Sequence, residues 1–314
     1  MGVLASIVDR SISGSFESEV FKIGDYAFYN CSNLTSVSFP NAKSIGGGAF
    51  YYCSNLTSVS IPNATSIGNY TFEYCSSLTS VSFLVATSIG NRAFYECRGL
   101  TEITDEFFPV VTSIGQYAFY NCSSLTSVSF PEVTSIGSKA FTYCRGLTSV
   151  SFPVATSLGY QSFYYCSELT SVSFPEVTSI GSSAFYGCNS LTSASFPKAT
   201  SIDSSSFNSC SSLTEVSIPN ATSIGSGAFQ ECSSLTEVSI PKATDIVEYA
   251  FYYCSNLTTI YVGTNTSTVC TLSSIDAFDG CTKLANIYVP SSLVDSYKSA
   301  TNWSSYASKI KAMP

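Results

Sequence analysis

The cysteines of this chain recur at a nearly constant interval, and this constrains the fold more than any other feature. The interval is 22 residues in nine of eleven cases, 25 between Cys97 and Cys122, and 27 between Cys254 and Cys281. A fixed period of 20–50 residues is the signature of a repeat architecture. The series comprises Cys31, Cys53, Cys75, Cys97, Cys122, Cys144, Cys166, Cys188, Cys210, Cys232, Cys254 and Cys281.

The repeating unit predicts one strand and two turns. Its pattern is C-S-x-L-T-S-V-S-F/I-P-x-A/V-T-S-I-G-x-x-A-F-Y-x. Ser58 to Ile61 alternates polar and apolar residues, which is typical of a strand with one buried face. Pro62 ends that strand because it cannot donate to a ladder, and the chain turns at Gly68. Since 22 residues cannot bury their own apolar face, about twelve units must stack into a solenoid with a parallel sheet.

Stacking places equivalent side chains in columns. We expect the Leu, Val and Phe columns to point inward, as at Leu56, Val59 and Phe72. The intervening strand residues point outward and are mostly serines, such as Ser58 and Ser60. The cysteines form a further inward column. Thirteen is an odd number and the spacing contains no C-x-x-C pair, so we expect reduced, buried thiols rather than disulfides or zinc ligands. Cys270 lies off the column, and we expect it to be the most exposed thiol.

The motifs L-x-x-V-x-F-P and S-I-G-x-x-A-F-x-x-C resemble the BspA-like family of leucine-rich repeats over about residues 20–290. The resemblance implies a leucine-rich-repeat solenoid of the α/β class that is mainly β. In such a solenoid a parallel β-sheet forms the concave face, with short helical turns on the convex side. It also implies an extracellular or cell-surface location and a role in adhesion.

Three segments follow from the repeat boundaries. Residues 1–20 are predicted to form an N-terminal cap in which Leu4, Ile7, Val8 and Ile12 cover the first repeat. Residues 21–290 form the solenoid. Residues 291–314 carry apolar side chains at intervals of three and four, including the only tryptophan, and predict a C-terminal helical cap. Met1 to Arg10 lacks the basic start and long apolar stretch of a secretory signal.

Composition narrows the range of functions. The net charge is −8 with only 13 lysines and arginines, which disfavours nucleic acid as a partner. The sequence contains no run of 18 apolar residues, so we expect no membrane insertion. The sequence contains no histidine, so imidazole acid–base catalysis and the common serine and cysteine nucleophile systems cannot operate. We therefore expect no enzyme activity, no metal site and no cofactor.

Departures from the repeat are the candidate binding residues. Tyr261 and Tyr288 replace serines at outward strand positions, and Glu215, Glu237 and Glu102 do the same in other repeats. Three extra residues around Asp105 and Glu106 cluster these acids with Glu102, as a solvated bulge or, less simply, as oxygen ligands for Ca²⁺. The inserted loop Val262–Leu272 adjoins the two tyrosines. Residues before the column cysteines are rich in tyrosine, whose rings could cover the core or stack on sugars.

These observations favour a non-catalytic binding or adhesion module at a cell surface that recognises a protein or a polysaccharide. An inert structural spacer within a larger surface or assembly protein is the alternative, because the serine-rich outward face is so uniform. Paired acids such as Glu215 and Glu237 could in principle hydrolyse a substrate, but an open sheet lacks a pocket that excludes water.

Overall fold

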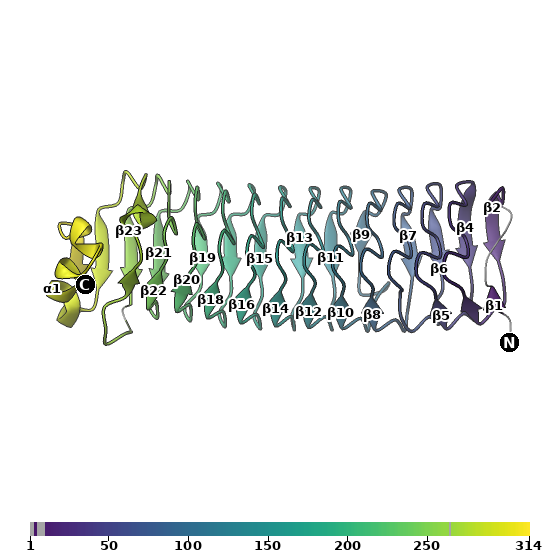
Figure 1. The fold of residues 1–314 in the computed structure, drawn as a ribbon, viewed down its shortest axis with the longest axis horizontal. Helices are drawn as coiled ribbons and strands as arrows, with labels where there is room; N and C mark the ends of the chain where they lie inside the picture. Colours follow the sequence, from purple (N-terminus) through teal and green to yellow (C-terminus); the bar gives the residue numbers. More distant parts are fainter. Residues whose placement is uncertain (1–2, 5–9, 264) are drawn as a thin grey trace. The chain divides into compact units, whose positions relative to one another are not determined.

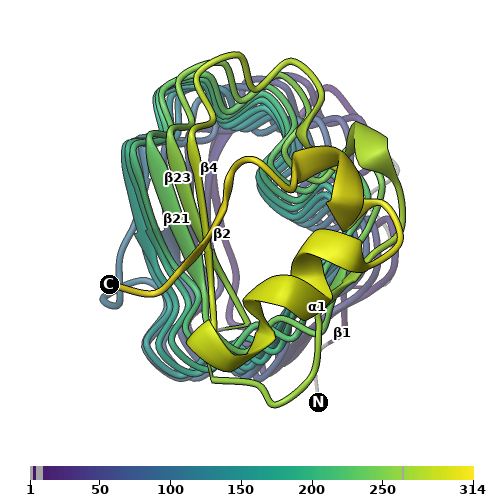
Figure 2. The same ribbon diagram turned by 90° about the vertical axis from the view of Figure 1, so that its left-hand side faces the viewer.

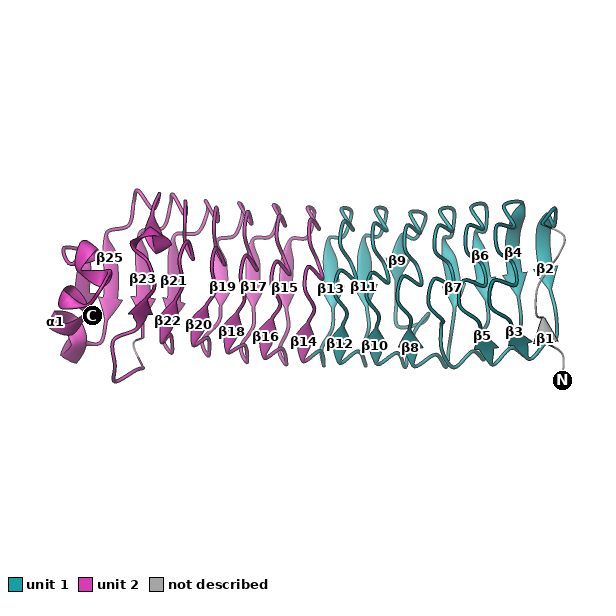
Figure 3. Ribbon diagram, viewed as in Figure 1, with its two compact units in different colours: residues 1–155 teal, residues 156–314 magenta. Residues whose placement is uncertain are grey.

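The computed structural model describes residues 3–4, 10–263 and 265–314. Ile7 and Val8 of the expected N-terminal cap lie outside the described residues. The chain divides into two compact units, residues 1–155 (unit 1) and 156–314 (unit 2), shown in Figure 3. Both units are built from the same coil turn, here called a rung. A rung consists of a first strand, a proline turn, a short second strand and a run of reverse turns (Figure 1).

The first strands of unit 1 form two parallel sheets, and within each sheet neighbouring strands are paired, so that Ser36, Val37 and Ser38 pair with Ser58, Val59 and Ser60. The 22-residue period produces this register because each strand repeats the previous one. These strands are β2 (Gly14–Glu17), β4 (Leu34–Ser38), β6 (Ser58–Ser60), β7 (Ser80–Ser82), β9 (Glu102–Ile103), β11 (Ser127–Ser129) and β13 (Ser149–Ser151). The second strands of unit 1 are β1 (Val3–Leu4), β3 (Lys22–Ile23), β5 (Ser44–Ile45), β8 (Ser88–Ile89), β10 (Ser113–Ile114) and β12 (Ser135–Ile136).

Unit 2 repeats this plan. Its first strands are β15 (Ser171–Ser173), β17 (Ser193–Ser195), β19 (Glu215–Ser217), β21 (Glu237–Ile240), β23 (Thr259–Val262), β25 (Asn286–Val289) and β26 (Ile310–Ala312). Its second strands are β14 (Ser157–Leu158), β16 (Ser179–Ile180), β18 (Ser201–Ile202), β20 (Ser223–Ile224), β22 (Asp245–Ile246) and β24 (Thr271–Leu272). The fold is thus a parallel-strand solenoid, as the sequence predicted.

Threonine strengthens the contact between rungs. The backbone N–H and the hydroxyl of Thr57 both donate to the carbonyl oxygen of Thr35, at 2.8 and 2.9 Å. Thr65 makes the same pair of bonds to Lys43, at 3.1 and 3.3 Å. A hydroxyl that satisfies a main-chain carbonyl explains why threonine recurs at these two positions of the repeat.

The segment after most second strands forms reverse turns, where short helical turns were expected; after β24 it forms a short 3-10 helix at Ile275–Phe278. Its amides alternate between two kinds of partner. Tyr26 and Phe28 donate to the next rung, to Gly47 and Ala49 at 3.0 and 2.7 Å, whereas Tyr29 donates back to Tyr26 at 3.0 Å. Tyr26 also has a left-handed backbone, with φ of 53°. A left-handed residue interrupts α-helical propagation. The segment therefore forms single turns that are hydrogen-bonded to the neighbouring rung.

Stacked phenylalanines fill the core. Phe28, Phe50 and Phe72 stack in sequence with ring centroids 4.9 and 5.3 Å apart, and all three are fully buried. Leu56 and Val59 are also buried, and Ser58 and Ser60 face outward. The predicted facing is therefore confirmed. Val150 and Val216 are exceptions, since both are only half-buried.

All 13 cysteines are free and buried, which confirms the predicted thiol column. The column has a second role that packing alone does not explain. The Cys53 thiol donates to the carbonyl oxygen of Phe28 at 3.0 Å, and Cys210 bonds Phe185 in the same way at 3.1 Å. Each thiol thereby satisfies a buried carbonyl of the preceding rung. Cys270 contradicts the expectation of exposure, because it is only 1% exposed.

The two ends add strands that the repeat pattern did not predict. β2 pairs with β4 in unit 1, where the ring centroids of Phe16 and Phe28 lie 5.2 Å apart. In unit 2 the chain runs through η1 (Ile275–Phe278), η2 (Ser291–Leu293), α1 (Val294–Ser299) and η3 (Trp303–Tyr306), where η marks a 3-10 helix, and then β26 pairs with β25. Figure 2 shows α1 lying across the end of the coil of unit 2.

Candidate binding surface

Two tyrosines form a stacked pair on the outward side of β23 and β25. Tyr261 and Tyr288 are register partners in the parallel ladder, and their ring centroids lie 5.1 Å apart at an interplanar angle of 21°. Both side chains are half-buried. Partial desolvation, the carboxylate of Glu237 and the neighbouring Tyr288 raise the pKa of Tyr261 above its ordinary value of 10.0. The predicted residues Tyr261, Tyr288 and Glu237 are therefore brought together.

Charged groups flank this pair on both sides. Glu237 pairs in register with Thr259 on β21 and β23, and Glu215 occupies the equivalent position of the preceding rung on β19. Both carboxylates are exposed. On the other side, β26 brings Lys311 opposite Tyr288. Sequence reasoning missed Lys311, because it lies beyond the last recognisable repeat.

Asn286 joins the lysine to the sheet. Lys311 Nζ donates to Asn286 Oδ1 at 2.5 Å, and Asn286 Nδ2 donates to the hydroxyl of Thr259 at 3.3 Å. We call the resulting surface of unit 2 the C-terminal face. Its outward side chains are Glu215, Glu237, Thr259, Tyr261, Asn286, Tyr288 and Lys311.

The other predicted acids belong to unit 1. Glu102, Asp105 and Glu106 are all exposed. β9 ends at Ile103, and the inserted residues leave the ladder in a turn closed by Phe107 N–H donating to Thr104 at 3.1 Å. Phe108 then re-enters the core and stacks on Phe83 with centroids 5.8 Å apart. The insertion is thus a solvated bulge. Among the described residues no group of three or more acidic or cysteine side chains could hold a metal ion.

The serine rows of unit 1 border a shallow hollow of about 280 Å³. Ser36 donates to the hydroxyl of Ser15 at 2.9 Å, so neighbouring rungs already satisfy part of the hydrogen-bonding capacity of this surface. The hollow is lined by Phe16, Glu17, Ser36, Val37, Ser38, Ser58, Val59, Ser60, Ser80 and Ser82.

The inserted loop Val262–Leu272 anchors the C-terminal segment, whereas we expected it to be a candidate ligand loop. The Trp303 indole N–H donates to the carbonyl of Cys270 at 2.6 Å, and the Cys270 N–H donates to the Tyr297 hydroxyl at 2.9 Å. Tyr297 and Trp303 are buried. These contacts also explain why Cys270 is buried. Desolvation raises the pKa of its thiol to about 12, and the charge of Asp245 acts in the same direction.

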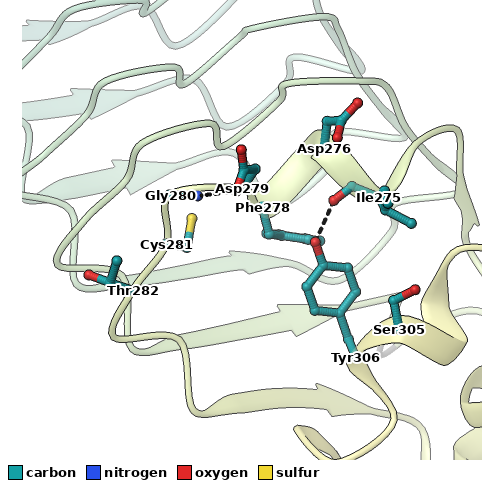
Figure 4. A pocket seen from close by; sticks show the side chains of 9 residues that line it. All are labelled: Ile275, Asp276, Phe278, Asp279, Gly280, Cys281, Thr282, Ser305 and Tyr306. Atoms are coloured by element: carbon teal, nitrogen blue, oxygen red, sulfur yellow. Dashed lines mark hydrogen bonds between the residues drawn. The ribbon is translucent and has the colours of Figure 1, made fainter.

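A second hollow, of about 360 Å³, lies where η3 meets the last rungs of unit 2. Figure 4 shows the Tyr306 hydroxyl directed at the carbonyl of Ile275, to which it donates. Asp279 accepts from the Gly280 N–H at 2.9 Å, and Asp276 accepts from the Ser274 hydroxyl at 3.1 Å. The sequence carried no signal for this hollow beyond Gly280, which replaces the larger residues found at this position in most rungs.

Parallel strands, a leucine column and a proline turn in most rungs define a leucine-rich-repeat solenoid. The sequence profile of the BspA type leucine rich repeat region (6 copies) matches this chain over residues 11–106, 87–211 and 200–311. The chain belongs to this family, as the repeat motifs predicted. No curated protein matches the sequence.

This chain is similar to solved structures of other bacterial leucine-rich repeat proteins. A leucine-rich repeat protein from Bacteroides ovatus is 26% identical and has a TM-score of 0.50, with 94% of this chain and 88% of that chain covered. A leucine rich cell surface protein from Faecalibacterium prausnitzii is 25% identical and has a TM-score of 0.48, with 94% and 90% covered.

Proposed function

We propose that this chain is a non-catalytic binding or adhesion module that recognises a protein partner through its C-terminal face and is presented at a cell surface. The observation that carries the proposal is the stacked pair Tyr261 and Tyr288, set among outward positions that are otherwise mostly serine. Tyrosine is enriched among the residues that dominate interface energies. Glu237 and Lys311 supply opposite charges at the edge, which is the usual anatomy of an apolar centre with a polar rim.

The setting of the carboxylates supports a binding role over catalysis. Glu215 and Glu237 are exposed on an open strand surface. Carboxylates that act as general acid and base gain their altered pKa values from enclosure. Leucine-rich-repeat families are in general non-catalytic and bind other proteins. Membership of the BspA type supports presentation at a cell surface. Among the described residues, no helix has the length and apolar character needed to cross a bilayer.

The proposal is tested by restoring the repeat's own residue. Serine occupies the equivalent position in most other rungs, so Tyr261→Ser with Tyr288→Ser removes the aromatic pair without disturbing the core. Binding of the whole chain is measured on parallel arrays of purified extracellular proteins and of polysaccharides. We expect protein binding that weakens at least roughly tenfold in the double variant, since aromatic hot spots are worth about 2 kcal/mol or more.

A matched control is Tyr253→Ser, which removes an exposed tyrosine that does not belong to the C-terminal face. Binding that survives in the double variant, or that is lost equally in the control, contradicts the assignment of the face. If the chain bound only polysaccharides, the partner would be a polysaccharide and not a protein.

An inert spacer is the second candidate, and the uniform serine rows of the first strands favour it. A spacer predicts that neither array retains the chain. It also predicts that the double variant behaves as the parent does in every assay.

A further inference from the structure

A trough on the turn side of unit 1 combines aromatic and hydrogen-bonding groups in one open hollow of about 270 Å³. It spans three consecutive rungs. From each rung it takes the residue just before the column cysteine and the residue just after it. We call it the tyrosine trough, and it is lined by Tyr52, Ser54, Tyr74, Ser76, Glu96 and Arg98.

The apolar wall of the trough is a stacked pair of rings. Tyr52 and Tyr74 lie with centroids 4.6 Å apart and an interplanar angle of only 10°. Tyr52 is 40% exposed and Tyr74 is half-buried. Both have left-handed backbones, with φ of 63° and 61°, and this shared conformation gives the two side chains the same orientation on successive rungs.

The polar end of the trough is a neutral ion pair. Arg98 Nε donates to Glu96 Oε2 at 2.6 Å, and Glu96 Oε1 accepts from Asn121 Nδ2 at 2.9 Å. The Arg98 side chain is 59% exposed, and its terminal guanidinium nitrogens have no hydrogen-bond partner among the described residues. The pair therefore offers donors beside a carboxylate without net charge.

We propose that the tyrosine trough binds a neutral glycan. A sugar has an apolar C–H face that packs against aromatic surface and hydroxyls that both donate and accept. Arg98 would donate to the hydroxyl oxygens, and Glu96 would accept from the hydroxyl hydrogens. Ser54 and Ser76 add one hydroxyl per rung at a spacing of about 4.8 Å, so a linear chain of sugars laid along the trough meets a polar group at each rung.

The ring geometry disfavours a proline-rich peptide, the other ligand that aromatic grooves commonly bind. Such peptides insert their prolines into grooves lined by aromatic rings. The close stacking of Tyr52 on Tyr74 leaves no slot between the two rings. Proline also has no backbone N–H, so a polyproline segment brings no main-chain donor for the Glu96 carboxylate, whereas a glycan brings hydroxyl groups.

The repeat itself supplies conservative variants for the test. Asn30 and Asn121 occupy the same position as Tyr52 and Tyr74 in other rungs, with φ of 58° and 54°. Tyr52→Asn with Tyr74→Asn therefore removes the rings at a backbone conformation that asparagine tolerates. Arg98→Ser restores the serine of neighbouring rungs. Tyr253→Asn and Arg145→Ser make the same changes outside the trough.

The whole chain is titrated calorimetrically with cellohexaose, mannohexaose and maltohexaose, and separately with decaproline. We expect one of the hexasaccharides to bind. Its affinity should fall roughly tenfold or more in the double asparagine variant and at least severalfold in Arg98→Ser, with changes below twofold in the two controls. Arg98→Ser removes an exposed side chain and leaves Glu96 its hydrogen bond from Asn121, so it tests the trough even if the double variant folds poorly.

Three results would overturn the proposal: no binding of any hexasaccharide, binding that is unchanged in both trough variants, or equal losses in the controls. Decaproline binding that depends on Tyr52 would identify a peptide groove instead. The trough belongs to unit 1 and shares no residue with the C-terminal face. Its test is therefore independent of the function proposed above.

Discussion

Replacing Phe185 with alanine tests whether the phenylalanine column carries the stability of unit 2. Phe185 is fully buried, and its ring stacks on Phe163 and Phe207 at 5.4 Å on either side. The ring centroids of Phe174 and Phe196 lie 6.1 and 5.8 Å from that of Phe185. A buried phenylalanine changed to alanine costs about 3–5 kcal/mol. Four aromatic neighbours place the expected loss at the upper end of that range, because few of them can move to fill the space.

The cysteine column provides a direct assay for this variant. Unfolding is followed by urea denaturation, and the exposure of thiols is followed by labelling under native conditions with mass-spectrometric assignment. Since each rung contacts mainly its neighbours, labelling should rise first at Cys188, which follows Phe185 by three residues, and at Cys210, whose thiol donates to the Phe185 carbonyl. Parent protein should show about 13 thiols only after denaturation.

Ser171→Ala is the control, because Ser171 lies on the exposed side of β15. It should change the free energy of unfolding by less than about 0.5 kcal/mol. Equal losses in the two variants would refute the assignment of the strand faces. An unaltered labelling pattern in Phe185→Ala would refute the idea that the column holds adjacent rungs together.

Two other perturbations concern buried ionisable groups. Desolvation raises the pKa of Cys188 from its ordinary value of 9.0 to about 12; the unfolded chain therefore ionises first, and stability present below pH 9 should be lost as the pH rises toward 12. Urea denaturation in reductant at pH 7 to 10.5 checks this, and a flat profile above pH 9 would contradict it. Arg92→Met should cost about 3 kcal/mol by leaving Glu73, only 1% exposed, without its ion-pair partner. The double variant with Glu73→Gln should recover part of that loss in thermal melts, and equal melting temperatures for the single and double variants would count against a buried charge as the cause.

The repeat predicted the parts of the fold that depend on position alone. Strand register, the inward columns and the reduced thiols all follow from 22-residue spacing, since equivalent residues must stack. The turn segments were harder to predict. Their hydrogen bonds alternate between the same rung and the next, as at Tyr26 and Tyr29. The spacing of apolar residues along the sequence does not predict this alternation.

The candidate sites show the same division. Tyr261 and Tyr288 could be paired from the sequence because they occupy one column. Lys311 could not be placed there, since β26 follows helices that break the period and its residues do not match the repeat. Cys270 was misjudged for a related reason: an insertion suggests exposure, but Tyr297 and Trp303 return from the C-terminus to cover it. Contacts made by non-repeating segments are invisible to a periodic argument.

The two proposed sites share a physical logic. Interior columns tolerate little change, because each buried side chain also supports the rungs above and below it. Outward positions and the residue before each cysteine are released from that constraint, and the chain places serine, asparagine, glycine, glutamate or tyrosine there. Adjacent substitutions at such positions create a surface feature without altering the core. Tyr52 with Tyr74 and Tyr261 with Tyr288 are both of this kind, so a binding function in this architecture should track neighbouring departures from the repeat rather than any single residue.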